Sequence, residues 1–338
     1  MLLSINLILF AGCRQGDNPQ KKDSSEKLPI GKSADIKHND GTSFDGSIYI
    51  LQKIKSSGPT GTVESEKSFG YGISRKITNI ESSGSFSFER KQIYFTTSQK
   101  IPGAENSPAG NFDYDSRKSP DSEIPSVLWT QAKETGETLT IHIASDGKVL
   151  SIDGMGSLKT NMKAKGDSLF GTQNTGVNAT YQFQLDDYYS DQKIAERLNA
   201  EMETATVLKK NPGDTWDVPA PLQYGSIKSE TSYKYLSDKG DLAELEITQT
   251  ISLENSTPKF KESELNEETK QSAAGFRYSK VKGNSTGIIY VMKGTGWIYS
   301  GKISQSYYYK MEIDNTISGK ADIYENSYTG YTEYKPLK

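Results

Sequence analysis

The sequence predicts a mainly β protein, built as two lobes of curved antiparallel meander sheet, half-barrel or sandwich-like, with one central amphipathic helix. Three observations support this fold class. The chain of 338 residues contains 20 tyrosines and 11 phenylalanines, and aromatic residues are enriched in strands. Apolar and polar residues alternate with a period of two along much of the chain, which is typical of half-buried strands. One segment near the middle has the three- and four-residue spacing of an amphipathic helix.

Residues 243–253 and 303–313 show the alternation most clearly. In each run the apolar side chains face one side of the strand and the polar side chains face the other. Shorter strands are expected at 139–144, 149–153, 181–185, 287–293, 296–300 and 328–334. Turn pairs separate the runs, namely Asp146-Gly147, Asp153-Gly154, Lys239-Gly240 and Ser300-Gly301. Because strand, turn and next strand are adjacent, the sheet should be antiparallel.

The segment 190–210 is predicted to form the central helix. Its apolar stripe consists of Ile194, Leu198, Met202, Ala205 and Leu208. Three glutamates are expected to face away from this stripe: Glu196, Glu201 and Glu203. Ser190 or Asp191 is suited to cap the start of the helix, and Pro212-Gly213 ends the segment.

The first residues form a short apolar run that ends in the string Leu9-Phe10-Ala11-Gly12-Cys13. The run is shorter than the roughly 20 apolar residues that span a bilayer and has the length of a signal-peptide core. The string resembles a bacterial lipobox, the motif at which a lipoprotein precursor is acylated and cut. The resemblance implies that Cys13 is residue one of the mature protein and carries acyl chains such as palmitate, which attach it to a membrane.

The residues before Cys13 include no Lys or Arg, whereas signal peptides normally begin with a basic region. The alternatives are an ordinary secretory signal and a buried N-terminal strand with a chance cysteine. Arg14 follows the cysteine in place of an aspartate that would retain a lipoprotein at the inner membrane. We therefore expect a location in the bacterial cell envelope, at the outer membrane or cell surface.

These patterns divide the chain into five parts. The segment after Cys13 has two prolines, few apolar residues and no periodicity, which indicates a flexible tether. The parts are a signal peptide (1–12), a lipidated flexible tether (13–42), a first β lobe (43–189), a connecting helix (190–210) and a second β lobe (211–338).

The body also resembles a family of uncharacterised β-rich bacterial lipoproteins that are built from repeated antiparallel hairpins. The segments that carry the resemblance are 111–116 and 139–152 in the first lobe, and 213–216 and 294–299 in the second. The function of that family is not established. The resemblance therefore implies a location and a fold class only.

Composition excludes several kinds of chemistry. Cys13 is the single cysteine, which excludes an intrachain disulfide and a cysteine-based zinc site. Forty basic and 43 acidic residues are mixed throughout, with a net charge of −3, so no basic footprint for nucleic acid exists. His38 and His142 lie in no catalytic motif. We expect no catalytic residue, no metal and no cofactor.

Tyrosines concentrate between residues 290 and 334 and include Tyr307, Tyr308 and Tyr309. Alternation places Tyr308 on the face opposite to its two neighbours. If one face is open, these three residues form a platform for a lipid, a glycan or a peptide. If both faces are covered, they are core.

The sequence thus predicts a membrane-anchored lipoprotein that is not an enzyme. Its expected role is binding or envelope structure, with a lipid or another apolar ligand cradled in the sheet. One alternative is an envelope-glycan hydrolase with paired carboxylates, because such pairs meet in space rather than in sequence. A second alternative is a surface adhesin.

Overall fold

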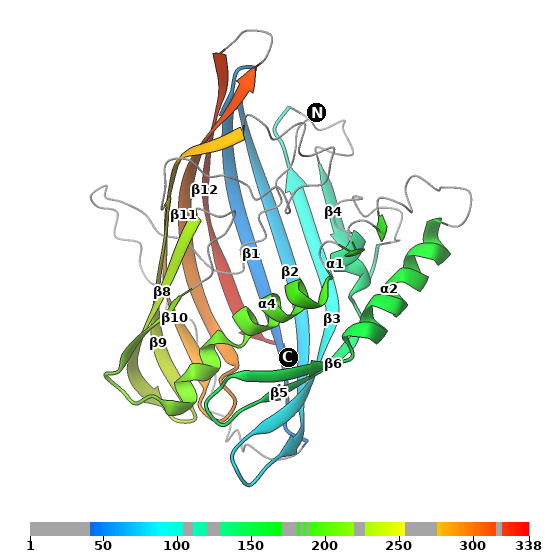
Figure 1. Ribbon diagram of the computed structural model, residues 1–338, viewed down its shortest axis with the longest axis vertical. Helices are drawn as coiled ribbons and strands as arrows, with labels where there is room; N and C mark the ends of the chain where they lie inside the picture. Colours follow the sequence, from blue (N-terminus) through cyan, green and yellow to red (C-terminus); the bar gives the residue numbers. More distant parts are fainter. Residues whose placement is uncertain are drawn as a thin grey trace.

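One open antiparallel sheet of twelve strands dominates the molecule, and the helices are few (Figure 1). The mainly β, antiparallel fold class is confirmed. The computed structural model describes residues 41–103, 111–119, 129–170, 181–182, 185–186, 189–219, 227–253, 276–315 and 320–337. The predicted signal peptide, Cys13 and nearly all of the predicted tether lie outside these residues.

The N-terminal half of the sheet has the strand order β6-β5-β3-β2-β1, and β4 also pairs with β3. Its strands are β1 (Ser43–Gly58), β2 (Gly61–Ile80), β3 (Phe86–Lys100), β4 (Phe112–Asp115), β5 (Thr138–Ile143) and β6 (Val149–Asp153). The C-terminal half continues in the order β12-β11-β10-β9-β8-β7. Its strands are β7 (Thr215–Pro219), β8 (Ile227–Lys239), β9 (Leu242–Leu253), β10 (Phe276–Met292), β11 (Ile298–Asn315) and β12 (Lys320–Pro336).

The first and last strands join the two halves. β1 and β12 pair antiparallel over most of their length, from Gly46 opposite Pro336 to Ser57 opposite Glu325. The two sets of strands that flank the central helix in sequence therefore belong to one continuous sheet.

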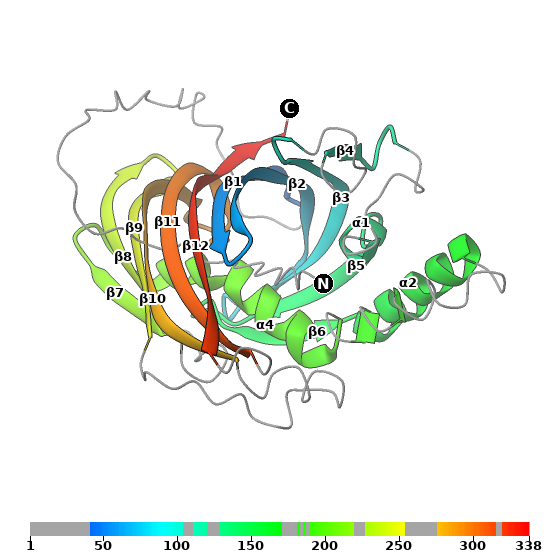
Figure 2. The same cartoon turned by 90° about the horizontal axis from the view of Figure 1, so that it is seen from above.

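The sheet curves around the central helix, so that α4 lies across its concave side (Figure 2). β-Bulges increase the local twist, and register shifts occur at Gly72/Ile73, Ile77/Asn79, Tyr235/Ser237 and Tyr290/Val291.

The pair Ser300-Gly301 was predicted as a turn, which is wrong, because it lies inside β11. Gly301 has a φ of 152°, and a Cβ there would lie 2.6 Å from the Ile288 carbonyl oxygen. The glycine thus permits close approach of two strands at a bulge.

The central helix is present in two parts, α4 (Asp191–Glu201) and the 3₁₀ helix η3 (Glu203–Lys209). The Ser190 side chain caps α4 by accepting a hydrogen bond from the Lys193 amide at 3.3 Å.

Two further helices are α1 (Trp129–Lys133) and α2 (Met155–Phe170). α2 was not predicted, because most of its residues are polar; Leu158 and Met162 are buried apolar side chains among the part of the helix whose burial is described.

The strand expected at 181–185 is wrong, because residues 181–182 and 185–186 are helical. Tyr181 and Leu185 are both buried and lie four residues apart, which places them on the same face of a helix. This spacing fits a strand and a helix equally well, and packing decides in favour of the helix.

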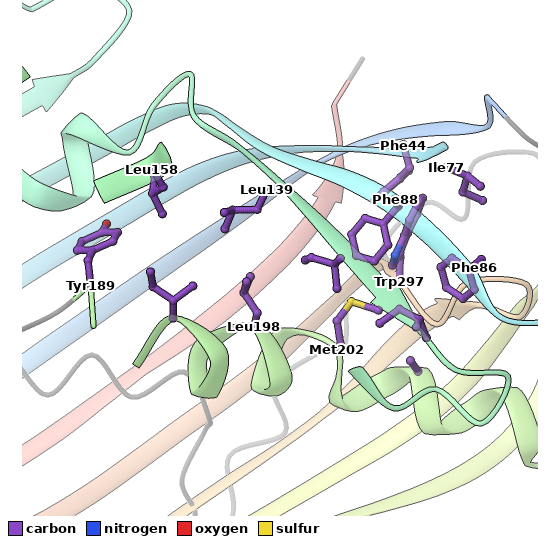
Figure 3. Close-up of a cluster of buried hydrophobic side chains, with 14 of the residues drawn as sticks. Phe44, Ile77, Phe86, Phe88, Leu139, Leu158, Tyr189, Leu198, Met202 and Trp297 are labelled. Carbon is purple, nitrogen blue, oxygen red and sulfur yellow. The ribbon is translucent and has the colours of Figure 1, made fainter. Parts of the chain in front are cut away.

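The largest cluster of buried side chains lies between α4 and the sheet (Figure 3). Leu198 of α4 points toward Leu139, and Met202, directly after the helix, points toward Phe88 and Trp297. The rings of Phe88 and Trp297 meet edge-to-face at 5.2 Å between centroids. This packing fixes α4 on the concave face, and the end of α4 then forms one wall of the cavity described below.

Candidate functional site

A cavity lies between the concave face of the sheet and the junction of α4 with η3. Its wall is formed in part by seven strands, namely β1, β2, β8, β9, β10, β11 and β12. The apolar part of the lining consists of Ile48, Ile50, Ile73, Ile247, Ile289, Trp297, Ile298 and Ile303. The free space is about 100 Å³, and a protein cavity of about 150 Å³ binds benzene. The cavity therefore admits the end of a ligand rather than a whole lipid.

One wall of the cavity is polar. It contains Arg75 of β2, Glu201 at the end of α4, Glu203 at the start of η3 and Tyr233 of β8. Charged side chains are rarely buried unless they are paired. The partners of these residues therefore determine what the wall can do.

A continuous network of ion pairs joins five side chains: Arg75, Arg90, Glu201, Glu134 and Arg197. Glu201 Oε1 accepts from Arg75 Nη2, and Glu201 Oε2 accepts from Arg90 Nε at 2.9 Å. Arg90 Nη1 donates to Glu134 Oε1 at 3.1 Å, and Arg197 Nη1 donates to Glu134 Oε2 at 2.8 Å. The network thus contains three guanidinium groups and two carboxylates.

The carboxylates of the network are held in the charged form. Burial acts to raise the pKa of Glu201, but Arg90 and Arg75 outweigh it and lower the pKa to about 2. Burial likewise opposes ionisation of Glu134, and Arg197 and Arg90 hold its pKa below the usual value. Both carboxylates are therefore negative at neutral pH.

Glu203 has a different environment. Its Oε1 accepts a hydrogen bond from the Tyr233 hydroxyl at 2.9 Å, and among the described residues it forms no ion pair. Burial raises the pKa of Glu203, and the bond from Tyr233 offsets only part of this effect. The cavity wall thus holds one carboxylate that is fully paired with cations and one that is not.

Close packing on both sides of η3 fixes the position of Glu203. A Cβ at Gly147 would lie 2.3 Å from the Ala205 carbonyl oxygen, and a Cβ at Gly296 would lie 2.2 Å from Ala205 Cα. Thr204 Oγ1 also donates to the Gly296 carbonyl oxygen at 2.7 Å. Two turns of the sheet therefore hold η3 between them.

Three polar atoms of the cavity-lining residues are buried and have no hydrogen-bond partner: Arg75 Nε, Gln249 Oε1 and Trp297 Nε1. A buried polar group without a partner costs about 1–3 kcal/mol. Such groups at one cavity indicate a place where a polar ligand group or water is accommodated.

The three tyrosines singled out from the sequence lie farther along β11. Tyr307 and Tyr309 are on the concave face with Ile303, and Tyr308 is on the opposite face. Tyr307 is 8% exposed and stacks on Tyr328 with 4.8 Å between ring centroids. Tyr309 bonds to Tyr328 through their hydroxyls at 2.6 Å. None of the three lines the cavity.

A second group of catalytic residue types meets on the convex side of strands β3, β5 and β6. Ser87 Oγ lies 2.7 Å from His142 Nδ1, and His142 Nε2 lies 2.9 Å from Asp153 Oδ2. A serine nucleophile requires access to substrate and nearby amides for an oxyanion. Ser87 is 8% exposed and lies inside the paired region of β2, β3 and β5, whereas Asp153 is exposed. Acyl transfer needs an accessible serine, whereas here the serine is buried and the carboxylate is exposed.

The sequence interpretation missed the residues of the polar wall. Glu201 and Glu203 were expected to face away from the apolar stripe, which is wrong, because both line the cavity. The signal was present: Glu201 follows Ile194 by seven residues and Leu198 by three, which places all three on the same helix face. Arg75 lies between Ile73 and Ile77 on the core-facing side of β2.

Among the described residues, no cluster of His, Asp or Glu side chains is suited to hold a metal ion. No helix in the described part of the chain is long and apolar enough to cross a membrane. Cys13, the predicted site of lipid attachment, lies outside the described residues.

The fold and the cavity define an open antiparallel half-barrel with a helix on its concave side. The model of a family of unknown function, DUF6263, matches residues 96–298, which is more than half of the chain. The chain therefore belongs to this family. The matched residues include α4, η3 and the cavity-lining parts of β8, β9 and β10. No curated protein matches the chain in sequence.

Solved structures match the chain at low similarity only. Lipovitellin, from a structure of its lipid–protein interactions, has a TM-score of 0.41 and 10% identity, and the match covers 89% of this chain and 26% of that one. DynF from the dynemicin biosynthesis pathway of Micromonospora chersina has a TM-score of 0.20 and 7% identity, over 96% and 94% of the chains. An outer membrane channel from Pseudomonas putida F1 has a TM-score of 0.21 and 8% identity, over 88% and 96%. The chain thus spans about a quarter of lipovitellin, and none of these likenesses bears on function.

Proposed function

We propose that this chain is a non-catalytic binding protein whose concave cavity holds the apolar end of a small molecule or an acyl chain. The cavity itself carries the proposal, because ligand sites are concave, mostly apolar and furnished with a few convergent polar groups. Seven isoleucines and Trp297 supply the apolar surface, and the wall around Glu203 supplies the polar groups.

A series of straight-chain alcohols from 1-butanol to 1-decanol tests this role by calorimetric titration. Each methylene that enters the cavity should add about 0.8 kcal/mol to the binding free energy. The gain should stop at the chain length that fills the cavity. The absence of saturable binding across the whole series would contradict the proposal.

Two variants locate the binding. Ile303→Trp places a large ring in the cavity and should abolish binding of the alcohols. Val63→Trp is the control, because Val63 is 53% exposed and lies outside the cavity lining. Equal loss of binding in both variants would show that the alcohols bind elsewhere.

The proposal includes export and attachment to the bacterial envelope, at the outer membrane or cell surface, through acyl chains on Cys13. The lipobox-like string that ends at Cys13 supports it. The Cys13→Ser variant should lose incorporation of radiolabelled palmitate and move from the membrane fraction to the soluble fraction. Retention of palmitate by the variant would contradict the attachment site.

One observation favours a hydrolase with paired carboxylates as the second candidate. Glu201 and Glu203 both line the cavity, and their environments move their pKa values in opposite directions, as in an acid and base pair. Against it, Arg75 and Arg90 occupy both oxygens of Glu201, which removes the lone pairs that attack would use. Release of reducing sugars from envelope glycan by the wild type, but not by Glu203→Gln, would establish the hydrolase instead.

A further inference from the structure

We propose that the cavity binds the anionic head group of an amphiphile beside Arg75, and that each ligand anion is taken up together with one proton, which binds to Glu203. The inference rests on the proposed binding function and specifies the ligand class. That class is a carboxylate or phosphate joined to a straight apolar chain.

The charges of the ion-pair network do not balance. The ion-pair network has guanidinium groups from Arg75, Arg90 and Arg197, and carboxylates from Glu134 and Glu201. One positive charge is therefore left over within the network. Arg75 is the guanidinium that lines the cavity, and its side chain is 8% exposed.

Glu203 carries a negative charge that is available at the cavity to balance this excess. Glu203 faces the same cavity but is bonded to Tyr233 rather than to an arginine. An ionised Glu203 brings the local total to three positive and three negative charges. A ligand anion in the cavity gives the same balance of positive and negative charges only if Glu203 becomes neutral. An ionised Glu203 would repel the ligand anion, since like charges in one cavity repel.

Glu203 is suited to accept the proton. The other titratable groups that line the cavity with it are Tyr233 on β8, Tyr334 on β12, Glu201 on α4 and Arg75 on β2, and Tyr233 donates the hydrogen bond to its Oε1. Burial already favours its neutral form. A protonated Glu203 also gains a hydrogen to donate to a ligand oxygen, while its other oxygen continues to accept from Tyr233.

The unpartnered Arg75 Nε agrees with this assignment, because a guanidinium binds carboxylate and phosphate through more than one N–H. Glu201 occupies Arg75 Nη2 and leaves Nε without a partner. A small shift of the Arg75 side chain on binding would bring a second donor to the ligand.

The test is calorimetric titration of the full chain carrying Cys13→Ser with three probes of equal chain length: octanoate, octyl phosphate and 1-octanol. Titration at pH 7.5 in two buffers of different ionisation enthalpy measures the protons taken up. Octanoate should bind more tightly than 1-octanol, with uptake of about one proton, whereas 1-octanol should take up none. Tighter binding of octyl phosphate than of octanoate would identify phosphate as the preferred head group.

Glu203→Gln is the decisive variant, because the Gln side chain has nearly the same shape and still accepts from Tyr233. It should bind octanoate several-fold more tightly at pH 7.5, because the parent chain must take up a proton on binding and the variant need not, and proton uptake should disappear. Glu196→Gln is the matched control on the exposed side of α4, and it should bind like the parent chain.

Two results would overturn the inference. One is equal affinity for octanoate and 1-octanol, and the other is octanoate binding without proton uptake and with no effect of Glu203→Gln. Either result leaves the proposed function in place, because an apolar ligand still binds. Failure of all three probes to bind would overturn the proposed function as well.

Discussion

The hydroxyl of Tyr233 donates a 2.9 Å hydrogen bond to Glu203 Oε1 on the wall of the cavity. This bond joins η3 to β8 and gives a half-buried carboxylate a polar partner that carries no positive charge. Glu201, two residues earlier, has two arginines. The contrast between the two glutamates gives the cavity its polar character. Replacing one glutamate should raise the free energy of unfolding, and replacing the other should lower it.

Replacement of Glu203 by Gln should stabilise the protein at neutral pH. The pKa of Glu203 is raised in the folded state above its ordinary value of 4.5. Its stabilising contribution is therefore complete below that ordinary pKa and is lost as pH rises through the folded pKa. The variant avoids this loss and should gain on the order of 1 kcal/mol. Urea unfolding at pH 4 and pH 8 checks this, and an equal gain at both values would contradict it.

Replacement of Glu201 by Gln should be strongly destabilising, by about 3–5 kcal/mol, because it leaves buried arginines without a countercharge. The pKa of Glu201 is lowered to about 2. Its contribution is therefore present above the unfolded pKa and is lost as pH falls through about 2. The difference between wild type and variant should shrink in acid, as measured by thermal unfolding from pH 7 to pH 2. Glu196→Gln should change stability by about 0.5 kcal/mol or less.

Period-two alternation predicted part of the sheet, because it records which face of a strand is buried. It did not predict β1, β2, β3 or β8, and it wrongly placed a strand at 181–185. It predicted the run at 303–313, which lies inside β11. It did not predict that β1 and β12 pair, because residues such as Ile48 and Tyr334 are opposite each other but almost the whole chain apart. The same alternation fits two sheets or one, and only long-range pairing decides between them.

The polar wall of the cavity was not predicted because its charged residues look like a solvated surface. Arg75 and Glu201 are each buried by a partner from another element. Their positions on apolar faces were readable, since an arginine between two core positions of a strand must point inward. The identity of the partner depends on the curvature of the sheet, which no local pattern encodes.

The tyrosines of β11 should differ in their effect on stability. Tyr307→Ala should cost about 3–5 kcal/mol, as for other large buried rings, because Tyr307 packs on Tyr328. Tyr308→Ala should cost about 1 kcal/mol, because Tyr308 lies on the opposite face with Lys280 Nζ 5.7 Å from its ring centre. Urea unfolding of the two variants measures the difference. Similar losses in both would show that the two faces are equally covered.

The row Ser87, His142 and Asp153 should be structural. Ser87 is buried in paired strands, so a fluorophosphonate probe that reacts with activated serines should leave it unlabelled. Ser87→Ala should lower the free energy of unfolding by about 1 kcal/mol through loss of the bond to His142. Mass spectrometry of the treated protein gives the answer, and a covalent adduct on Ser87 would establish a nucleophile there.

Native mass spectrometry of the full chain carrying Cys13→Ser, purified without detergent, tests the binding role most directly. We expect a population with the added mass of a small amphiphile, and we expect Ile303→Trp to remove that population while Val63→Trp retains it. A bare chain mass in all three proteins, unchanged after incubation with octanoate, octyl phosphate and 1-octanol, would contradict a ligand in the cavity.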